Sequence, residues 1–501
     1  MRYCVALALL LFFAAGAAVA EEWPVFYGDG ARSGTTSEPL PRDLSAAWVH
    51  RAGFPPEPGF TDVVHVGSQR AITHAVTFDF VYHPVIAQGR VYYGSSAEER
   101  VVCLDAETGE QLWTFYAEGP VRLAPAFHQG QIYFGSDDGR VYCLEADTGE
   151  PVWTFSAAPQ ERRIVANGHV SSQWPVRTGV SIAPAVEGSG ATAYFAAGLF
   201  PERGGVQLCA VDAATGEPRW KRTVQYAAQG HILVEGDRLF LATGRSSPAQ
   251  FRRSDGEPLA DRGFPRREGG GSFVGKLGEM LQFGPNEYGI IRIRVFPEDD
   301  PDDRTPLSWR ISGVQTGIGG VRLLAGREAY YLLRNEQLLA LGPDSFRGLL
   351  QESAREFDQR AKQFHMYKSG VQVREDRVLM EKLPEATQWK SQVEEPFSMI
   401  RAADTLVVGG EGWVAGFRAD TGEEAWRLRV EGKAYGLAVA GGALYASTDR
   451  GMIYCFREGE FEAAAPPARQ RNAYPWDEVE RETFRRAAEQ ALAECKSPRG
   501  F

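Results

Sequence analysis

The feature that most constrains this sequence of 501 residues is a repeat with a period of 40. The stretch from Arg90 to Trp113 matches the stretch from Gln131 to Trp153 almost residue for residue. Further copies of the same turn and following strand occur at Asp212–Trp220 and Arg418–Trp426. A fixed period of roughly 20 to 50 residues is typical of solenoids, propellers and repeat arrays. The fold must therefore be assembled from similar units.

Each unit has the pattern of a four-stranded antiparallel sheet. Four short runs rich in Val, Ile, Tyr, Phe and Trp are separated by turn residues. In the turn Asp147-Thr148-Gly149-Glu150, acid and hydroxyl groups can accept bonds from nearby backbone amides, and glycine adopts the positive φ of a tight turn. Trp153 then falls on the outer strand, where its ring can pack against the neighbouring sheet and its N–H can donate to a carbonyl. Each unit is therefore predicted to be one blade of a propeller.

Counting these outer-strand positions gives seven, of which five carry a tryptophan. The other two are a degenerate position near Leu259 and one placed between Ile290 and Trp309. The last three strands, within residues 434–456, lack a fourth, which Leu44–Val49 can supply from the N-terminal side. We therefore predict an all-β fold, an eight-bladed β-propeller of four-stranded antiparallel blades, with seven blades as the alternative. The predicted docking residues are Trp48, Trp113, Trp153, Trp220, Trp389, Trp426, Gly109, Gly149, Gly216 and Gly422.

The ends of the chain and its insertions lie outside this repeat. Residues 1–20 contain one charge, an apolar run and a small-residue site at Ala18-Val19-Ala20, which predicts a signal peptide cleaved after Ala20. The propeller is then expected over 21–460, in the periplasm or secreted, and no later stretch reaches the ~18 apolar residues of a membrane span. The predicted insertions are 51–80, 161–176 and a helical one at 344–366, and a C-terminal helix is predicted at 470–495.

Charge and cysteine content exclude some classes of protein. The chain has 54 basic and 65 acidic residues, a net charge of −11, and no long Lys/Arg run, so no nucleic-acid partner is expected. Most cysteines fall within predicted strands and no C-x-x-C motif occurs, which predicts buried, unpaired thiols. A monomer is expected, and its partner is an unknown envelope protein or a small ligand.

The run from Val141 to Trp153 resembles the tryptophan-docking repeat of propellers of the pyrroloquinoline quinone (PQQ) type. This superfamily includes the quinoprotein alcohol dehydrogenases and the outer-membrane assembly propeller lipoprotein. The resemblance covers roughly residues 23–457, and Trp23–Gly34 is similar to the N-terminal lead-in of such bacterial propellers. This resemblance implies the fold but indicates little about activity, because propellers have many unrelated functions.

The sequence departs from the dehydrogenase pattern that this resemblance would imply. Dehydrogenase members are expected to have an adjacent Cys-Cys pair beside the quinone and calcium ligands beneath it, and some carry a C-x-x-C-H haem motif. Neither cysteine motif occurs here, and no calcium ligand set can be placed, so PQQ and calcium remain possible but unassigned cofactors. The lipid-anchor cysteine of the assembly lipoprotein is also absent, because Cys4 precedes the apolar run.

Other motifs are weak. The acidic run Glu298–Asp303 lacks the spacing of a calcium loop, and Gly270 with Gly275-Lys276 is followed by Leu277 where a phosphate-binding loop needs Ser or Thr. His65, His74 and His83 are nine residues apart, a spacing that does not make them converge. No G-x-S-x-G motif occurs. We therefore predict no metal site and no catalytic residues.

The funnel at the propeller axis is the most plausible binding place, because inner strands and their loops meet there. The candidate cofactor-binding residues are Arg122, Trp174, Arg177, Arg245 and Tyr435. Guanidinium and aromatic groups could bind an anionic or planar ligand by paired hydrogen bonds and stacking. The alternative is that these arginines pair with neighbouring carboxylates and stabilise the fold.

Three functions are consistent with these observations. The first is an exported, non-catalytic β-propeller that acts as a binding or scaffold module through its funnel or its helical insertion. The second is a PQQ- and calcium-dependent oxidoreductase of the alcohol or sugar dehydrogenase type, with Arg177 and Trp174 as cofactor contacts. The third is a glycan-binding propeller that uses Trp174. The presence of the repeat without a recognisable set of catalytic residues favours the first function, the binding or scaffold module.

Overall fold

The computed structural model describes most of the chain after the predicted signal peptide. The described residues are 21–59, 77–201, 204–244, 247–259, 270–285, 289–295, 314–334, 336–363 and 377–461, with helical residues 479, 482–483, 485–487 and 489–490. The signal peptide at 1–20, His65, His74, Arg245 and the run Glu298–Asp303 lie outside them.

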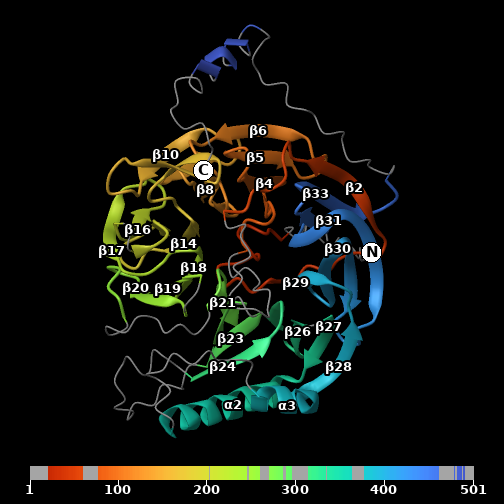
Figure 1. Ribbon diagram of the computed structural model, residues 1–501. Coiled ribbons are helices and arrows are strands. Elements are labelled where there is room, and N and C mark those ends of the chain that lie inside the picture. Colours follow the sequence, from red (N-terminus) through yellow and green to blue (C-terminus); the bar gives the residue numbers. More distant parts are fainter. Residues whose placement is uncertain are drawn as a thin grey trace, which may run out of the picture.

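The sheets are arranged around a central axis as a ring (Figure 1). The described residues form six four-stranded sheets, one seven-stranded sheet and one two-stranded hairpin. Five of the four-stranded sheets run in chain order from the inner to the outer strand. Four of these five carry a tryptophan on the outer strand. They are β3 (Val85–Ala87), β4 (Arg90–Ser95), β5 (Arg100–Asp105) and β6 (Gln111–Tyr116); β7 (Ala126–His128), β8 (Gln131–Gly135), β9 (Arg140–Glu145) and β10 (Pro151–Ser156); β14 (Ser181–Pro184), β15 (Ala191–Ala197), β16 (Val206–Asp212) and β17 (Pro218–Val224); and β25 (Arg322–Ala325), β26 (Tyr330–Arg334), β27 (Gln337–Leu341) and β28 (Thr387–Gln392).

The two sheets between β17 and β25 depart from the repeat. One consists of β18 (Gly230–Glu235), β19 (Arg238–Leu241) and β20 (Ala249–Arg252), with β13 (Thr178–Gly179) parallel to β18 at its inner edge. Its outer position holds only a bridge between Phe251 and Pro258, because the docking motif has decayed there. The other consists of β21 (Val274–Leu277), β22 (Met280–Phe283), β23 (Ile290–Val295) and β24 (Val314–Gly319).

The prediction of an outer strand between Ile290 and Trp309 was wrong. Ile290 begins β23, the third strand of its sheet, and the fourth strand, β24, begins at Val314. The prediction failed because a long connection separates these two strands and β24 carries no tryptophan. The hydrophobic pattern of Ile290–Val295 was that of a strand, but its position in the blade could not be read from it.

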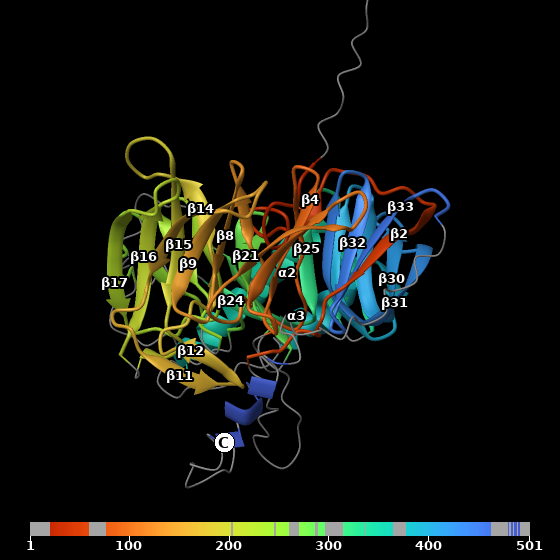
Figure 2. The same cartoon turned by 90° about the horizontal axis from the view of Figure 1, so that it is seen from above.

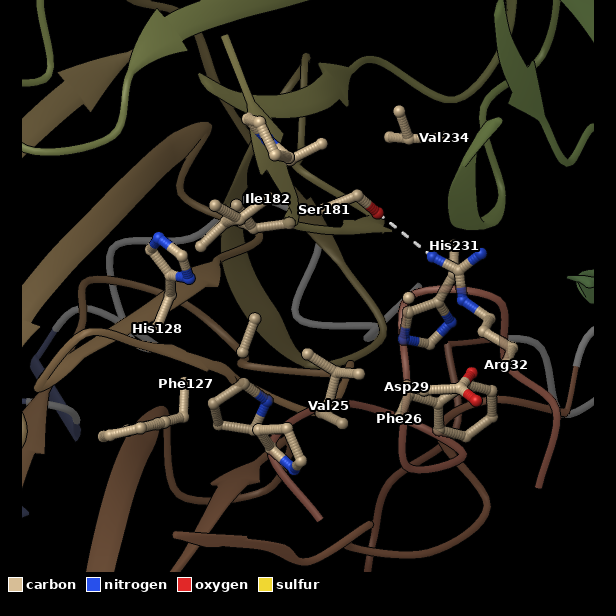
Figure 3. A pocket seen from close by; sticks show the side chains of 18 residues that line it. Val25, Phe26, Asp29, Arg32, Phe127, His128, Ser181, Ile182, His231 and Val234 are labelled. Carbon is tan, nitrogen blue, oxygen red and sulfur yellow. Dashed lines mark hydrogen bonds between the residues drawn. The ribbon is translucent and has the colours of Figure 1, made fainter. Parts of the chain in front are cut away.

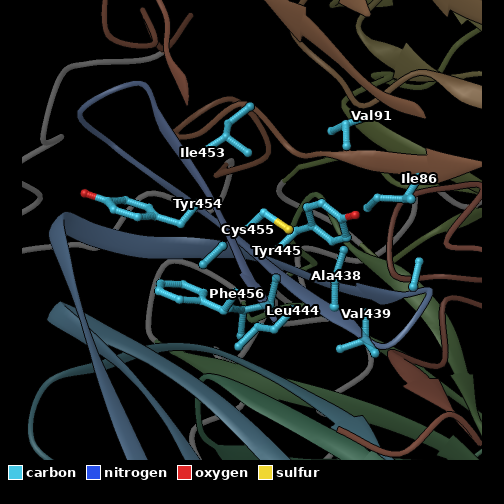
Figure 4. Packing of buried hydrophobic residues seen from close by; sticks show 14 of the residues in the cluster. Ile86, Val91, Ala438, Val439, Leu444, Tyr445, Ile453, Tyr454, Cys455 and Phe456 are labelled. Carbon is cyan, nitrogen blue, oxygen red and sulfur yellow. The ribbon is translucent and has the colours of Figure 1, made fainter. Parts of the chain in front are cut away.

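The seven-stranded sheet closes the ring. It has the order β1 (Thr35–Thr36), β29 (Pro396–Ala402), β30 (Thr405–Arg418), β31 (Glu424–Ala440), β32 (Ala443–Thr448), β33 (Met452–Glu458) and β2 (Leu44–Arg51). The N-terminal strand β2 pairs antiparallel with β33, so the ends of the propeller meet within one sheet. Residues of β3 and β4 then pack against this sheet, as Ile86, Val91, Tyr445 and Cys455 show in Figure 4.

The strands are buried according to their place in the sheet. The middle strands are covered by a neighbouring sheet on both faces, and Val101–Leu104 of β5 are completely buried. In the outer strand β10, half-buried Trp153 and Phe155 alternate with exposed residues. This alternation is expected where one face packs on a sheet and the other meets water.

Two helices follow β27 on the outside of the ring. Helix α2 spans Pro343–Gln363 and α3 spans Arg377–Ala386, and Phe346 of α2 packs on Tyr330 with ring centroids 5.3 Å apart. Near the C-terminus, Val479 is helical and 73% exposed. None of the helices in the described part of the chain is long and apolar enough to cross a membrane.

Candidate functional site

Tryptophans of the outer strands join each sheet to the next. Their indole N–H groups donate to backbone carbonyls at distances of 2.9–3.2 Å. A Cβ on Gly149 would lie 2.6 Å from the Trp113 ring, so only glycine permits this contact. Trp426 packs against the core of the closing sheet. The donor and acceptor pairs are Trp48 with Ala106, Trp113 with Ala146, Trp153 with Ala213, Trp220 with Arg253, and Trp389 with Ala419; Gly109, Gly216 and Gly422 lie against Trp48, Trp153 and Trp389.

One face of the ring carries the hairpin of β11 (Arg163–Ala166) and β12 (His169–Ser172), seen at the lower side in Figure 2. We call it the insertion face. Residues 54–59 and 77–82 also lie here and reach several sheets: the Glu57 amide donates to Ser96 Oγ at 2.9 Å, and the rings of Phe80 and Tyr435 lie 5.8 Å apart. The insertion therefore covers this end of the axis.

Two of the predicted ligand-binding arginines meet beneath this cover. Arg122 Nε donates to Asp137 Oδ2 at 2.7 Å, and Arg177 binds the same carboxylate through Nε and Nη2, each at 2.9 Å. The side chains of Arg122, Asp137 and Arg177 are 1%, 0% and 4% exposed. Burial alone would raise the pKa of Asp137, but the two guanidinium groups hold it below its ordinary value.

A second carboxylate, Asp79, completes this cluster from the insertion. Its Oδ2 accepts bonds from Arg122 Nη1 at 3.3 Å and from the Gly59 amide at 2.7 Å. Burial raises the pKa of Asp79 despite the attraction of Arg122. A Cβ on Gly59 would lie 2.8 Å from Arg177 Nη1, so the insertion packs directly on the arginines. Arg122 and Arg177 are thus enclosed by their own counter-ions and covered by the chain.

The other predicted ligand contacts do not join this cluster. Trp174 is buried between sheets and donates to the Gly204 carbonyl at 3.4 Å. Tyr435 stacks obliquely on Phe397 at 4.9 Å, and burial raises its pKa to about 12. Arg245 lies outside the described residues. The described candidates therefore do not form an open ring of guanidinium and aromatic groups.

The N-terminal segment Trp23–Thr36 crosses the other end of the axis, and Figure 1 shows a red trace in the middle of the ring. We call it the N-terminal strap. Backbone hydrogen bonds of 2.8–2.9 Å link it to the inner strands of four sheets, and β1 extends β29 as a parallel strand. The pairs are Trp23 with Ile86, Pro24 with Phe127, Ala31 with Lys276, and Gly34 with Arg401. Both ends of the axis are therefore occupied by the chain itself.

The strap buries aromatic and cationic side chains at the axis. The Phe26 ring stacks on His231, with centroids 4.1 Å apart and an interplanar angle of 1°. Arg322 lies between two rings, 3.8 Å from the centroid of Tyr27 and 4.0 Å from that of Phe273. Its Nη2 donates to the Arg32 carbonyl at 3.1 Å. This group could not be recognised from the sequence, because its members come from remote parts of the chain.

The described residues do not fit a PQQ and calcium site. The guanidinium groups that would bind quinone oxygens are held by Asp137 and Asp79, and Trp174 offers no open face. Among these residues, no three His, Cys, Asp or Glu side chains are placed to hold a metal ion. The predicted buried, unpaired thiols are confirmed for Cys103, Cys143, Cys209 and Cys455.

Comparison with known proteins identifies the class. A family model described as outer membrane protein assembly factor BamB matches residues 65–174 and 166–259. A quinohemoprotein alcohol dehydrogenase from Pseudomonas putida HK5 is 12% identical, with a TM-score of 0.53, over 89% of this chain and 82% of that one. A europium-containing methanol dehydrogenase is 11% identical, with a TM-score of 0.51, over 87% and 98% of the two chains. No curated protein sequence matches.

The chain is a β-propeller of PQQ-like repeats. The predicted resemblance to propellers with repeats of the PQQ type is confirmed. At such low identity, the likeness to the two dehydrogenases shows the fold alone, and their cofactors and substrates do not follow from it.

Proposed function

We propose that this chain is an exported propeller that acts as a non-catalytic binding or scaffold module. The observation that carries this proposal is that the chain covers both ends of its own axis, with the N-terminal strap on one face and residues 54–59 and 77–82 on the other. Arg122 and Arg177 are engaged by carboxylates of the chain. Contact through an outer surface fits this arrangement better than chemistry at the axis.

We propose eight blades for this ring. The count treats the long strand β31 as a member of two blades, because residues 424–433 pair with β30 and residues 434–440 pair with β32. The seven-stranded sheet then supplies two blades and the four-stranded sheets supply six. Strand β2 is the outer strand of the eighth.

We place the contact surface on the hairpin of β11 and β12. Val165 and Val170 are paired across the two strands and are 77% and 49% exposed, so they form a small apolar patch. An apolar groove of about 220 Å³, lined by Ile164, Leu199 and Phe200, lies beside it. Exposed apolar side chains next to a groove are typical of protein contact sites, so the partner is proposed to be an envelope protein.

Site-specific photo-crosslinking tests this surface in producing cells. A photoreactive residue at Val165 is expected to give a discrete crosslinked product in the periplasm or medium, where the mature chain begins at Glu21. The matched control is the same residue at Tyr116, which is 67% exposed on the outer strand β6. Equal products at both positions, or none at Val165, would contradict the proposal.

A thermal-shift titration separates this function from the oxidoreductase hypothesis. A ligand at ~100 times its Kd that binds only the folded state adds about 2.7 kcal/mol of stability. We expect PQQ with calcium to produce no such shift, because the candidate contacts are engaged within the chain. A calcium-dependent rise in Tm would reject the scaffold proposal in favour of a quinoprotein.

A further inference from the structure

A cavity of about 300 Å³ lies between the N-terminal strap and the inner strands β7, β14 and β18. Its volume is at the small end of the range of about 300–1,000 Å³ in which proteins bind small organic molecules. Figure 3 shows its two kinds of wall: Val25, Phe127, Ile182 and Val234 are apolar, whereas Arg32, Asp29 and His231 form a polar end. The cavity lies on the face opposite the Arg122–Asp137 cluster, so it is a separate site.

His231 borders this polar end with a buried ring. His231 is only 4% exposed, so its side chain is more than nine-tenths buried. Neither ring nitrogen has a hydrogen-bond partner among the described residues. Phe26 stacks on one side of the ring. Gly179 packs so closely against it that a Cβ at this position would lie 2.2 Å from His231 Cδ2. Burial holds the pKa of His231 well below 6.5, so the ring is a neutral donor and acceptor. Neither nitrogen has accessible surface of its own, so His231 borders the cavity without offering a nitrogen to it.

Arg32 supplies positive charge at the same end. Its terminal nitrogens donate to the carbonyls of Val274 and Ile232 and to Ser181 Oγ, the last at 3.0 Å (Figure 3). These bonds leave Nε–H of the guanidinium unused within the described part of the chain. No carboxylate among those residues lies within salt-bridge distance of Arg32, whereas Arg122 and Arg177 share Asp137. Asp29 attracts Arg32 from farther away, but Arg322 is also close enough to repel it, so two positive charges face one carboxylate. Burial lowers the pKa of Arg32 to about 9, which leaves it protonated at neutral pH.

A second histidine lies at the far end of the cavity. His128 Nε2 is buried without a partner among the described residues, and Figure 3 places its ring beyond the apolar wall. Because His128 Nε2 has no accessible surface of its own, Arg32 supplies the polar contact, and an apolar cavity with one polar end selects a molecule with an apolar body and a polar head. The positive charge of Arg32 selects a head that is negative.

We propose that this cavity binds a small apolar carboxylate, with its head toward Arg32 and His231 and its body between Val25, Phe127 and Ile182. An aromatic acid suits the aromatic and branched aliphatic lining. The inference stands on this cavity alone and does not depend on the scaffold function.

Titration calorimetry with benzoate tests the proposal, with benzamide as the neutral analogue and acetate as the anion without an apolar body. Benzoate is expected to bind one to one, benzamide about tenfold or more weakly, as for the loss of a hydrogen bond to a charged group, and acetate not measurably. No benzoate binding, or equal binding of benzoate and benzamide, would overturn the proposal.

Two variants locate the binding. Ile182→Trp fills the cavity and is expected to abolish benzoate binding, whereas Val186→Trp, at a 48% exposed position near the same strand, is expected to preserve it. Benzoate binding retained by a folded Ile182→Trp protein would place the site elsewhere. In the wild-type protein, benzoate must also shift the ring resonances of His231 and His128, and unchanged resonances would reject the site even where a variant does not fold.

Discussion

The two ends of the ring bury arginine in different ways. On the insertion face, Arg122 and Arg177 share the carboxylate of Asp137, and Asp79 adds a second negative charge. Under the N-terminal strap, Arg32 binds carbonyl and hydroxyl oxygens, and Arg322 lies between aromatic rings. One cluster contains its counter-charges as bonded partners. In the other, Asp29 is the nearby carboxylate for two arginines and forms no salt bridge with them, so the cluster is cationic, and it adjoins a cavity.

This difference separates a structural use of arginine from a binding use. Burying a charge costs several kcal/mol, and the cost is offset only where partners are well placed. Asp137 offsets it for Arg122 and Arg177 within the chain, so these side chains hold the insertion on the ring. At the strap the compensation is incomplete, and a bound anion would complete it.

The largest expected effect comes from removing the shared carboxylate. Asp137→Asn leaves two buried guanidinium groups without their main partner, and we expect it to lower the free energy of unfolding by about 3–5 kcal/mol. Denaturant unfolding measures the loss. Asp147→Asn is the control, since it alters a 67% exposed partner of Arg90 and should cost about 1 kcal/mol or less. Equal losses of unfolding free energy in the two variants would show that the buried cluster stabilises the fold no more than the exposed pair of Asp147 and Arg90.

A smaller loss is expected at the strap. Arg32→Met removes a buried charge that has no carboxylate partner among the described residues, and it leaves the Val274 and Ile232 carbonyls without this donor. We expect a loss of about 1–2 kcal/mol in the same unfolding experiment, because the lost hydrogen bonds are partly offset by the relief of charge burial. A loss as large as that of Asp137→Asn would remove the distinction between the two ends.

Asp79→Asn should cost still less. Burial raises the pKa of Asp79, so its ionisation opposes folding at neutral pH, and neutralising it compensates for the weakened contact with Arg122. We expect a change within about 1 kcal/mol at neutral pH. Asp137 has the opposite shift, and its contribution is present above the ordinary pKa of 3.8 and is lost as the pH falls through its lowered value. A pH series of both variants checks this contrast.

The smallest effect concerns His169, which ties the hairpin to the insertion. Its ring nitrogens contact Glu99 Oε1 at 2.8 Å and Glu57 Oε2 at 2.9 Å. Although burial opposes it, these carboxylates raise the pKa of His169 above 6.5, so its stabilisation is present below that pH and is lost as the pH rises through the raised value. His169→Gln should speed proteolysis of the hairpin at about pH 6 and make little difference at alkaline pH. The same acceleration at both pH values would exclude a charge-dependent tie.

The repeat could be predicted from the sequence because its signals are local. Gly149 and Trp153 occupy fixed positions within a single turn and strand, and the same spacing recurs at Gly216 and Trp220. Where the motif decays after Phe251, local signals no longer assign strands to positions, and β24 was missed.

The two clusters at the axis could not be predicted in this way. Arg122 meets Asp79 across 43 positions, and Arg32 meets Ser181 across 149. No local pattern marks such pairs, because they depend on which strand ends converge in the finished ring. Arg122 and Arg177 were found as arginines near inner strands, but Asp137, their partner, lies in a loop with no distinguishing motif.

The pairing of β2 with β33 also determines when this protein can finish folding. Ser45 Oγ bonds to the Gly459 carbonyl across 414 positions, so the early segment has no partner until nearly the whole propeller has been synthesised. Contacts between such distant residues slow folding, since a long loop must close before they form. Newly made chains thus pass through a stage in which an unpaired β2 is open to proteases and to pairing with other chains. The assembled ring gains its protection only in its last step.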